Sequence, residues 1–167
     1  MIELRDEQSS DEPLLFELYA STREAELALT NWDQPTRQAF LNMQFRAMRQ
    51  GYRSMFPQGQ FSIILVDGAA VGRIVIDRPP QEVHVADIVL LPSERGRGIG
   101  GRVMKDLMAE AAGAGKPVTL QVLKQSRAIA FYQRLGFVTT GGTEVYDRME
   151  WLPLNQQAIV KMPEQAG

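Results

Sequence analysis

Cysteine is absent from the 167 residues of the sequence. This absence excludes disulfide bridges, zinc sites built from thiolates and any covalent intermediate carried on a cysteine. Long apolar runs are missing as well, because no window approaches the roughly 20 apolar residues that a transmembrane helix requires. The first ten residues, MIELRDEQSS, have neither the basic nor the apolar region of a signal peptide. We therefore expect a cytoplasmic protein that does not act at a membrane.

An excess of positive charge is also missing. The 18 Lys and Arg residues are outnumbered by 20 Asp and Glu residues, and the isoelectric point of about 5.5 argues against nucleic acid as a partner. The shares of apolar residues (44%) and charged residues (23%) are close to the average for globular proteins. We predict one domain over residues 1–153, leave the tail at 154–167 unassigned, and expect no metal site.

The first third of the sequence predicts one short strand and two helices. Residues 2–4 alternate as in a strand, and Pro13 lies in the first turn of a helix that Ser9, Ser10 or Asp11 would cap. Pro35 opens the second helix. The apolar residues expected to form the helix stripes are Leu14, Leu15, Leu18 and Tyr19, followed by Phe40, Leu41, Met43, Phe45, Ala47 and Met48.

The rest of the sequence predicts strands that alternate with helices. Asp67-Gly68 between two apolar runs predicts a β-hairpin, and Gly141-Gly142 marks the turn between two closing strands. The expected ranges are strands at 61–66, 71–76, 83–91 and 118–122, helices at 100–112 and 126–135, and the two closing strands within 137–151. This order predicts an α/β fold in which a mixed sheet carries helices on both faces.

The glycine-rich turn LPSERGRGIGGR, at residues 91–102, is the most specific local signal. It lies between a predicted strand and a predicted helix, where unpaired backbone N–H groups and the helix dipole favour a phosphate. Gly96, Gly98 and Gly100 would let the backbone approach such a ligand, because they carry no Cβ. Positive charge would come from Arg95, Arg97 and Arg102.

Three other interpretations of this turn have to be weighed. The spacing Gly96-x-Gly98-x-x-Gly101 satisfies the dinucleotide fingerprint, but several elements precede it and Leu123-Lys124 follows the next strand where a ribose-binding acid belongs. A Walker A loop is excluded because no Gly-Lys-Ser/Thr follows. The glycines could also serve only to pass the chain from strand to helix.

A second segment favours one interpretation. Residues 95–100, RGRGIG, resemble the R/Q-x-x-G-x-G/A signature of the GNAT superfamily of N-acetyltransferases, and residues 126–137, SRAIAFYQRLGF, resemble its second block. The resemblance extends over residues 60–151. It implies a mostly antiparallel central sheet of six to seven strands (an α+β arrangement), acetyl-CoA as cosubstrate, and a turn whose backbone amides hold the coenzyme A pyrophosphate. The residues implied in cofactor binding are Leu90, Leu91, Arg95, Gly96, Arg97, Gly98, Ile99, Gly100, Gly101, Arg102, Ser126 and Tyr132.

The resemblance also implies how the thioester is handled. In this family the strand before the turn separates from the next strand at a bulge, so that the pantetheine arm inserts beside it. A backbone N–H near Leu90 would then polarise the thioester carbonyl. Tyr132 matches the family tyrosine that protonates the leaving thiolate, and Ser126 stands where many members have an asparagine.

A primary amine has to lose a proton before it attacks a thioester, so a general base is expected. The candidates are His84, Asp87 and Glu82 around the strand before the turn. Alternation along a strand places Glu82 and His84 on one face and Asp87 on the other, so the three cannot share one cleft. His84, the only histidine, has a suitable ordinary pKa, although a lone histidine on a strand is often structural.

Acceptor recognition in this family falls to the N-terminal helices and the last hairpin. A cationic acceptor would use the carboxylates there and an anionic acceptor the arginines, although such charges are also typical of an ordinary solvated surface. The candidates are Glu24, Glu26, Trp32, Asp33, Arg46, Tyr52, Arg53 and Tyr146, with Glu82 on the sheet.

The function predicted from the sequence is acetyl transfer from acetyl-CoA to a primary amine of a small molecule, peptide or protein. Without cysteine, direct transfer in a ternary complex is the simplest mechanism. A non-catalytic acyl-CoA-binding module and a dinucleotide-binding oxidoreductase are the alternatives. A homodimer formed through the C-terminal strands is a further expectation from similar proteins.

Overall fold

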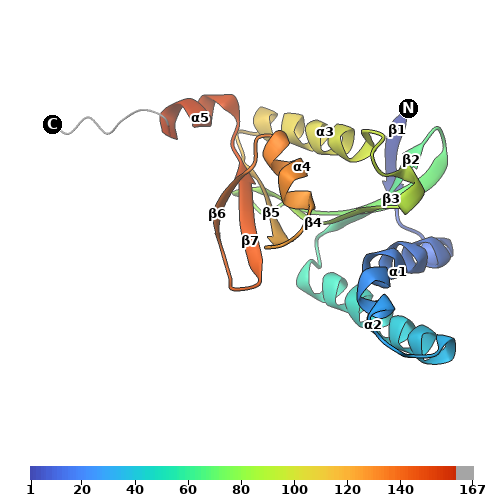
Figure 1. Cartoon of the computed structure of the whole chain (residues 1–167). Helices are drawn as coiled ribbons and strands as arrows, with labels where there is room; N and C mark the ends of the chain where they lie inside the picture. The colour runs from blue at the N-terminus through green and yellow to red at the C-terminus, as the bar shows by residue number, and fades with distance from the viewer. Residues whose placement is uncertain (161–167) are drawn as a thin grey trace. The chain divides into compact units, whose positions relative to one another are not determined.

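The computed structural model describes residues 1–160, which form a seven-stranded mixed sheet and five α-helices (Figure 1). The order of hydrogen-bonded strands is β1-β2-β3-β4-β5-β7-β6. The strands are β1 (Ile2–Asp6), β2 (Gln60–Val66), β3 (Ala69–Asp77), β4 (Val83–Leu90), β5 (Val118–Leu123), β6 (Val138–Gly142) and β7 (Tyr146–Trp151). The helices are α1 (Glu12–Ala28), α2 (Gln34–Met55), α3 (Ile99–Gly113), α4 (Ala128–Arg134) and α5 (Leu154–Val160), with short 3-10 turns η1 (Ser9–Asp11) and η2 (Pro92–Glu94). The predicted mixed, mainly antiparallel sheet is confirmed.

The chain divides into two compact units, of which the first comprises Met1–Val75 and Asp87–Ile99. Here β1 pairs antiparallel with β2, from Ile2 opposite Val66 to Asp6 opposite Ser62. The next hairpin turns at Asp67 (φ 49°) and Gly68 (φ 85°). Two consecutive positive φ values are the mark of a type I′ turn, so the turn predicted at Asp67-Gly68 is confirmed.

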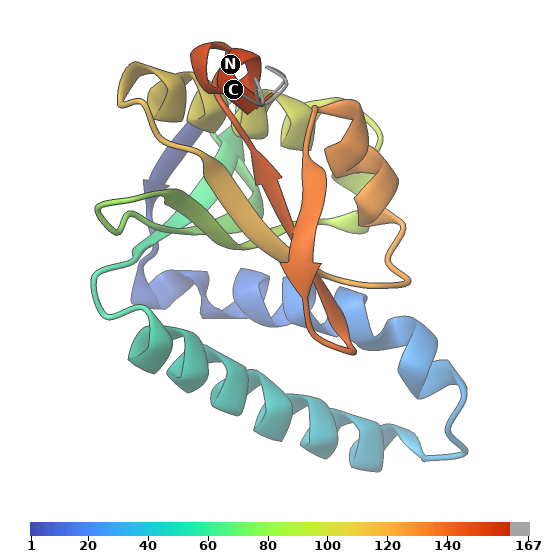
Figure 2. The ribbon, with the colours of Figure 1, turned by 90° about the vertical axis from the view of Figure 1, so that its left-hand side faces the viewer.

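Helices α1 and α2 lie side by side in both ribbon views (Figure 2). Their shared apolar cluster contains Leu15 and Tyr19 from α1, Leu41 and Phe45 from α2, and Ile63 from β2. At the start of α2 the Asp33 carboxylate accepts a hydrogen bond from the Thr36 N–H at 2.9 Å, a typical N-cap. Two helices thus cover one apolar surface of the first unit.

The apolar stripe predicted for α2 is partly wrong. Of its six predicted residues Leu41 and Phe45 are buried, and Phe40 and Met48 are partly buried against the same cluster, whereas Met43 is 58% exposed. Ala47 is exposed as well. Residues four apart lie on one face of a helix, but a residue two positions away points about 200° around the axis. The buried face of α2 is therefore narrower than its count of apolar residues indicates.

The second unit comprises Ile76–Ala86 and Gly100–Gly167. Parallel pairing joins β4 to β5 over three residues each, Val83–Val85 with Val118–Leu120. Strand β5 also pairs antiparallel with β7 along its whole length, and β7 pairs with β6. On α3 the buried residues Val103, Leu107 and Ala111 recur every four positions and form one apolar face.

The closing hairpin turns later than predicted. Gly141 and Gly142 belong to β6, and the chain reverses over Thr143–Val145. The Thr143 hydroxyl accepts hydrogen bonds from the backbone N–H groups of Val145 (3.2 Å) and Tyr146 (3.0 Å), which stabilises a turn without glycine. A register shift between Thr139 and Gly141 accounts for the glycines within the strand.

The segment after Pro153, which the sequence leaves unassigned, begins with helix α5; residues 161–167 of that tail lie outside the described residues. No helix within residues 1–160 combines the length and the apolar character that a bilayer crossing requires.

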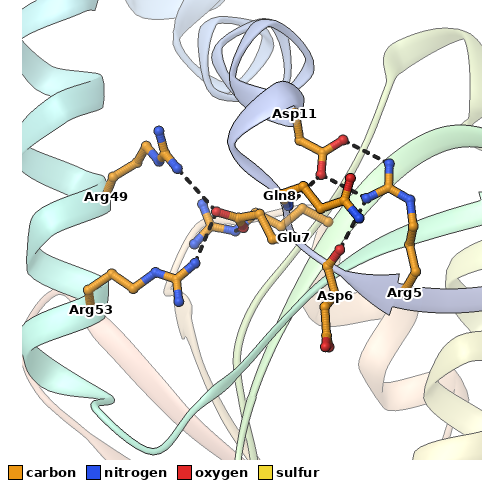
Figure 3. A network of polar contacts seen from close by, with 8 residues as sticks. Arg5, Asp6, Glu7, Gln8, Asp11, Arg49 and Arg53 are labelled. Carbon is orange, nitrogen blue, oxygen red and sulfur yellow. Dashed lines mark hydrogen bonds and ion pairs between the residues drawn. The ribbon is translucent and has the colours of Figure 1, made fainter.

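An ion cluster around Glu7 joins the chain after β1 to α2 and β3 (Figure 3). The Glu7 side chain is 4% exposed, and its Oε1 accepts hydrogen bonds from Arg49 Nη2 at 3.3 Å and Arg53 Nη2 at 3.2 Å. Arg73, also 4% exposed, places its Nε 3.9 Å from Glu7 Oε2. The Arg73 guanidinium also faces the ring of Tyr52 at 5.3 Å. Glu7 is thus the counter-charge of a buried arginine.

Replacement of Glu7 by alanine should lower the free energy of unfolding by about 3 kcal/mol, because Arg49, Arg53 and the buried Arg73 would lose the carboxylate that they share. Urea unfolding of the two proteins measures this difference. Glu17→Ala, on the exposed face of α1, is the matched control and should change stability by less than about 0.5 kcal/mol. Equal losses in both variants would contradict the role of Glu7.

Candidate functional site

The turn between β4 and α3 depends on glycine for its backbone conformation. Gly96 has φ +75° and Gly98 has φ +81°, and no atom lies within 4 Å of a Cβ built at either position. Space is therefore not the constraint, whereas a positive φ strains any residue with a Cβ. The first turn of α3, which begins at Ile99, follows directly and leaves N–H groups without intrahelical partners. A turn of this kind suits an anion.

The three arginines of the turn have different roles. Arg95 donates to the Leu90 carbonyl oxygen (3.1 Å) and to the Ser21 hydroxyl (3.2 Å), so it ties the turn to the end of β4 and to α1. Arg97 pairs with Glu94 at 3.1 Å and Arg102 pairs with Asp106 at 3.4 Å, with both arginine side chains at least 65% exposed. Exposed pairs contribute about 0–1 kcal/mol, so these two arginines can exchange partners for a ligand.

At the end of β4, the backbone of Leu90 approaches β3 closely. The Leu91 N–H donates to the Val71 carbonyl oxygen at 2.9 Å. Successive N–H groups of a strand point in opposite directions, so the Leu90 N–H points away from β3. A Cβ at Gly72 would lie 2.6 Å from the Val89 oxygen and 2.7 Å from Leu90 Cδ2. Gly72, which is not among the residues predicted from the sequence, therefore sets the position of Leu90; the signal for it is a glycine within an apolar strand.

The sequence block at residues 126–137 is explained by the way in which α4 ends. The Gly136 N–H bonds to the Gln133 oxygen and the Phe137 N–H to the Tyr132 oxygen, each at 3.0 Å. This pair of bonds is a Schellman motif, and Gly136 supplies the positive φ of +100° that it needs. Phe137, 2% exposed, then anchors the chain in the apolar interior.

Tyr132 is held within this motif. Its side chain is 8% exposed, and its ring lies 5.2 Å from that of Phe131 and 5.7 Å from that of Phe137. Before the helix, the Ser126 hydroxyl oxygen accepts a hydrogen bond from the Ala128 N–H at 3.1 Å. Packing thus fixes the direction of the Tyr132 side chain, and Ser126 keeps its own hydroxyl hydrogen to donate.

A polar row crosses β4, β5 and β7 in the second unit. His84 Nδ1 lies 2.9 Å from the Thr119 hydroxyl oxygen, and Arg148 Nη2 lies 2.9 Å from Glu82 Oε2. The structure therefore brings Glu82 and His84 together, as predicted from their shared face. Thr119 and Arg148 were missed, because only the strand register places His84 opposite Thr119. Within the described residues, no group of three or more His, Asp and Glu side chains could hold a metal ion.

The pKa values in this row are shifted by burial and by charge. Burial lowers the pKa of His84; Glu82 and Asp77 oppose this shift, and Arg148 adds to it. For Glu82, burial raises the pKa, but hydrogen bonds from Thr119 and Arg148 bring it below its ordinary value. His84 is thus neutral and Glu82 ionised near pH 7.

Asp87 has other neighbours. Burial raises the pKa of its carboxyl group, against the attraction of the Arg73 guanidinium. It therefore belongs with Arg73 in the first unit and not with the row that contains His84. Its role as a base is left as a prediction.

The predicted acceptor residues fall into two groups. Glu24 and Arg46 are exposed, Trp32 and Tyr146 are 42% and 44% exposed, and Glu26 pairs with Arg23 on the surface of α1. Asp33, by contrast, caps α2, and Tyr52 and Arg53 surround the Glu7–Arg73 pair. The members of the second group have evident structural roles.

Comparison with known proteins agrees with this geometry. A sequence model described as the acetyltransferase (GNAT) family matches residues 17–137. Similar solved structures include the PaiA N-acetyltransferase of Thermoplasma acidophilum in complex with coenzyme A, with 18% identity, a TM-score of 0.66 and coverage of 91% of this chain and 99% of that one. An acetyltransferase of Thermus thermophilus has 17% identity, a TM-score of 0.67 and coverage of 91% and 97%. The ribosomal-protein-S18-alanine N-acetyltransferase of Escherichia coli has 17% identity, a TM-score of 0.58 and coverage of 100% and 99%. These likenesses show a shared fold.

Replacement of Gly72 by alanine should lower the free energy of unfolding by about 1–3 kcal/mol, because the added methyl group overlaps the backbone of β4. Gly51→Ala is the matched control: a Cβ there meets no atom within 4 Å, and alanine should stabilise α2 by about 0.5–1 kcal/mol. Urea unfolding compares the two. Stabilisation of both variants would show that β3 and β4 are not constrained at Gly72.

Proposed function

The chain belongs to the acetyltransferase (GNAT) family, and we propose that it transfers an acetyl group from acetyl-CoA to a primary amine within a ternary complex. The observation that carries this proposal is the turn from β4 into α3, where Gly96 and Gly98 adopt positive φ directly before a helix N-terminus. A similar structure, PaiA of Thermoplasma acidophilum, is a complex with coenzyme A.

In this proposal the turn binds the coenzyme A pyrophosphate. The donors are the backbone N–H groups from Gly96 to Gly101, with the positive end of α3 behind them. Arg97 and Arg102 exchange their exposed carboxylate partners for phosphate oxygens. Ser126 donates its remaining hydroxyl hydrogen to the cofactor, the task for which many relatives use an asparagine amide.

The acyl transfer itself exchanges one bond for another. The amine nitrogen attacks the thioester carbonyl, a C–N bond forms and the C–S bond breaks. The Leu90 N–H, which points away from β3, stabilises the oxyanion, while the Leu91 N–H is bound to β3. Tyr132 donates a proton to the departing thiolate, a weak base that needs little help.

His84 is the proposed general base. Its pKa is lowered mainly by burial, so the imidazole is neutral and able to take the amine proton near pH 7. Glu82 is less suited, because its ion pair with Arg148 helps to hold its pKa below the ordinary value. Its carboxylate is therefore a weak base. Asp87 is the alternative base, since burial raises its pKa.

The acceptor is proposed to be a primary amine of a small molecule, a peptide or a protein. Exposed side chains that would contact it are Glu24 and Trp32 near the N-terminal helices and Tyr146 at the start of β7. Both carboxylates and aromatic faces attract a protonated amine before it binds. A cytoplasmic location and a homodimer complete the proposal.

We predict that the protein releases coenzyme A from acetyl-CoA when it is supplied with a panel of primary amines. A thiol reagent follows the release without background, since the enzyme contains no cysteine. Initial rates at several concentrations of both substrates should give intersecting double-reciprocal lines. Parallel lines would reject direct transfer, and acetyl-CoA binding without turnover on any amine would favour the non-catalytic module.

With an amine that is turned over, kcat should fall as the pH drops through a pKa below 6.5, because protonation of His84 removes the base. His84→Gln should lower kcat by about 100-fold and abolish this acidic limb, while Tyr132→Phe should cost about tenfold. If kcat fell only in Asp87→Asn, Asp87 would be the base. Unchanged turnover in all three variants would contradict the proposed roles of His84, Tyr132 and Asp87.

A further inference from the structure

We propose that a groove between α1 and α2 binds a small organic anion that carries an apolar or aromatic group, and that Arg46, Arg49 and Arg53 bind its charged end. All of these residues belong to the first unit. The inference is independent of the proposed acetyl transfer, because it rests on the charges and the shape of the two helices. It concerns an anion, whereas the proposed acceptor is an amine.

Helix α2 concentrates positive charge in a chain whose net charge is −2. It contains four arginines and no Asp or Glu, whereas α1 contains four glutamates and one arginine. Three of the arginines, Arg46, Arg49 and Arg53, follow one another at intervals of three and four residues, so they lie along one face of the helix. An anion is therefore attracted to one side of α2 and not to the protein surface in general.

Two adjoining hollows lie beside this row of arginines. The first has a volume of about 410 Å³, and Arg46, Arg49 and Arg53 line it. The second has a volume of about 460 Å³, and Pro13 and Phe16 line it. Both hollows share Glu12, Phe45 and Arg46, so one ligand can extend from one into the other. Each volume lies within the range of about 300–1,000 Å³ that is usual for small-molecule sites.

The two hollows differ in chemistry. Guanidinium groups dominate the first, whereas the second offers the rings of Phe16 and Phe45, which meet edge to face with their centres 5.4 Å apart. A ligand with a carboxylate or phosphate at one end and an apolar group at the other complements both. Such a ligand would form charge-assisted hydrogen bonds in the first hollow and bury its apolar group in the second.

The arginines retain donors for such a ligand. A guanidinium group has five N–H donors. Arg49 and Arg53 reach from α2 toward Glu7, and each donates one hydrogen bond to its Oε1, at 3.3 Å and 3.2 Å (Figure 3). Their side chains are 30% and 54% exposed. Arg46 is exposed and takes part in none of the hydrogen bonds or ion pairs described for residues 1–160.

The carboxylates already present leave the row with an excess of positive charge. Glu7 is 4% exposed, and Arg49, Arg53 and the buried Arg73 share it. The other carboxylate in the groove is Glu12, which is 61% exposed and places its Oε2 3.6 Å from Arg49 Nη1. This long, exposed pair is weak, so a ligand carboxylate can replace Glu12 at Arg49.

Phenylacetate is the test ligand, since it joins one carboxylate to an aromatic ring. Full-length protein labelled with 15N gives backbone and arginine Nε–H signals in 1H–15N correlation spectra. We expect saturable shifts at Arg46, Arg49, Arg53 and Phe45. Acetate, which lacks the ring, and 2-phenylethanol, which lacks the carboxylate, should bind at least about tenfold more weakly. Equal affinity for the three compounds, or no saturable shift at these residues with phenylacetate, would overturn the inference.

Variants test the roles of the individual charges. Arg46→Gln should weaken phenylacetate binding about tenfold, because one charge-assisted contact is lost. Arg134→Gln, on the exposed surface of α4, is the matched control and should leave the affinity unchanged. Glu12→Gln should strengthen binding about twofold to threefold, because the carboxylate that competes for Arg49 is removed. A damaged fold cannot produce this gain.

Unchanged affinity in Arg46→Gln, or weaker binding in Glu12→Gln, would contradict the proposed site. The titrations contain no acetyl-CoA and no amine. If the protein acetylated no amine but bound phenylacetate at Arg46, the proposed function would fail and this site would stand. An active enzyme without the phenylacetate shifts would give the opposite result.

Discussion

Two backbone positions with positive φ determine how the chain passes from β4 into α3. Gly96 and Gly98 have open space around them, so their requirement for glycine is conformational and not steric. With these angles the first turn of α3 begins at Ile99 immediately after the turn, and Arg95 reaches back to the Leu90 carbonyl oxygen. The backbone N–H groups of the turn and the end of β4 are therefore parts of one local arrangement. Gly72 adds a steric constraint, because a Cβ at this position would overlap the end of β4 at Val89 and Leu90.

Ionised carboxylates serve two different purposes in this chain. Glu7 neutralises Arg73 in an almost fully buried place and ties α2 to the strands of the first unit. Glu82 pairs with Arg148 at a less buried place, in the same polar row as the contact between His84 and Thr119. Breaking the first pair acts on stability, since it removes the carboxylate that a buried arginine faces. Breaking the pair of Glu82 and Arg148 changes the charges that act on the pKa of His84.

The element order and both glycine motifs could be predicted from the sequence because their signals are local. Asp67-Gly68 specifies its own turn, and Leu-Gly-Phe carries the residues of a helix C-cap in consecutive positions. Thr119, Arg73 and Gly72 were not identified, because their roles depend on which residues of neighbouring strands face each other. The turn placed at Gly141-Gly142 was wrong for a related reason: Thr143 stabilises the reversal through hydrogen bonds that glycine spacing does not reveal.

The central claim is that the turn with Gly96 and Gly98 holds the pyrophosphate of coenzyme A. Calorimetric titration of the purified protein with acetyl-CoA, with NADH as the parallel ligand, tests it most directly. We expect saturable binding of acetyl-CoA in the micromolar range and no binding of NADH. Absence of acetyl-CoA binding, or NADH binding that acetyl-CoA does not displace, would contradict it and favour a turn that is only structural or a dinucleotide site.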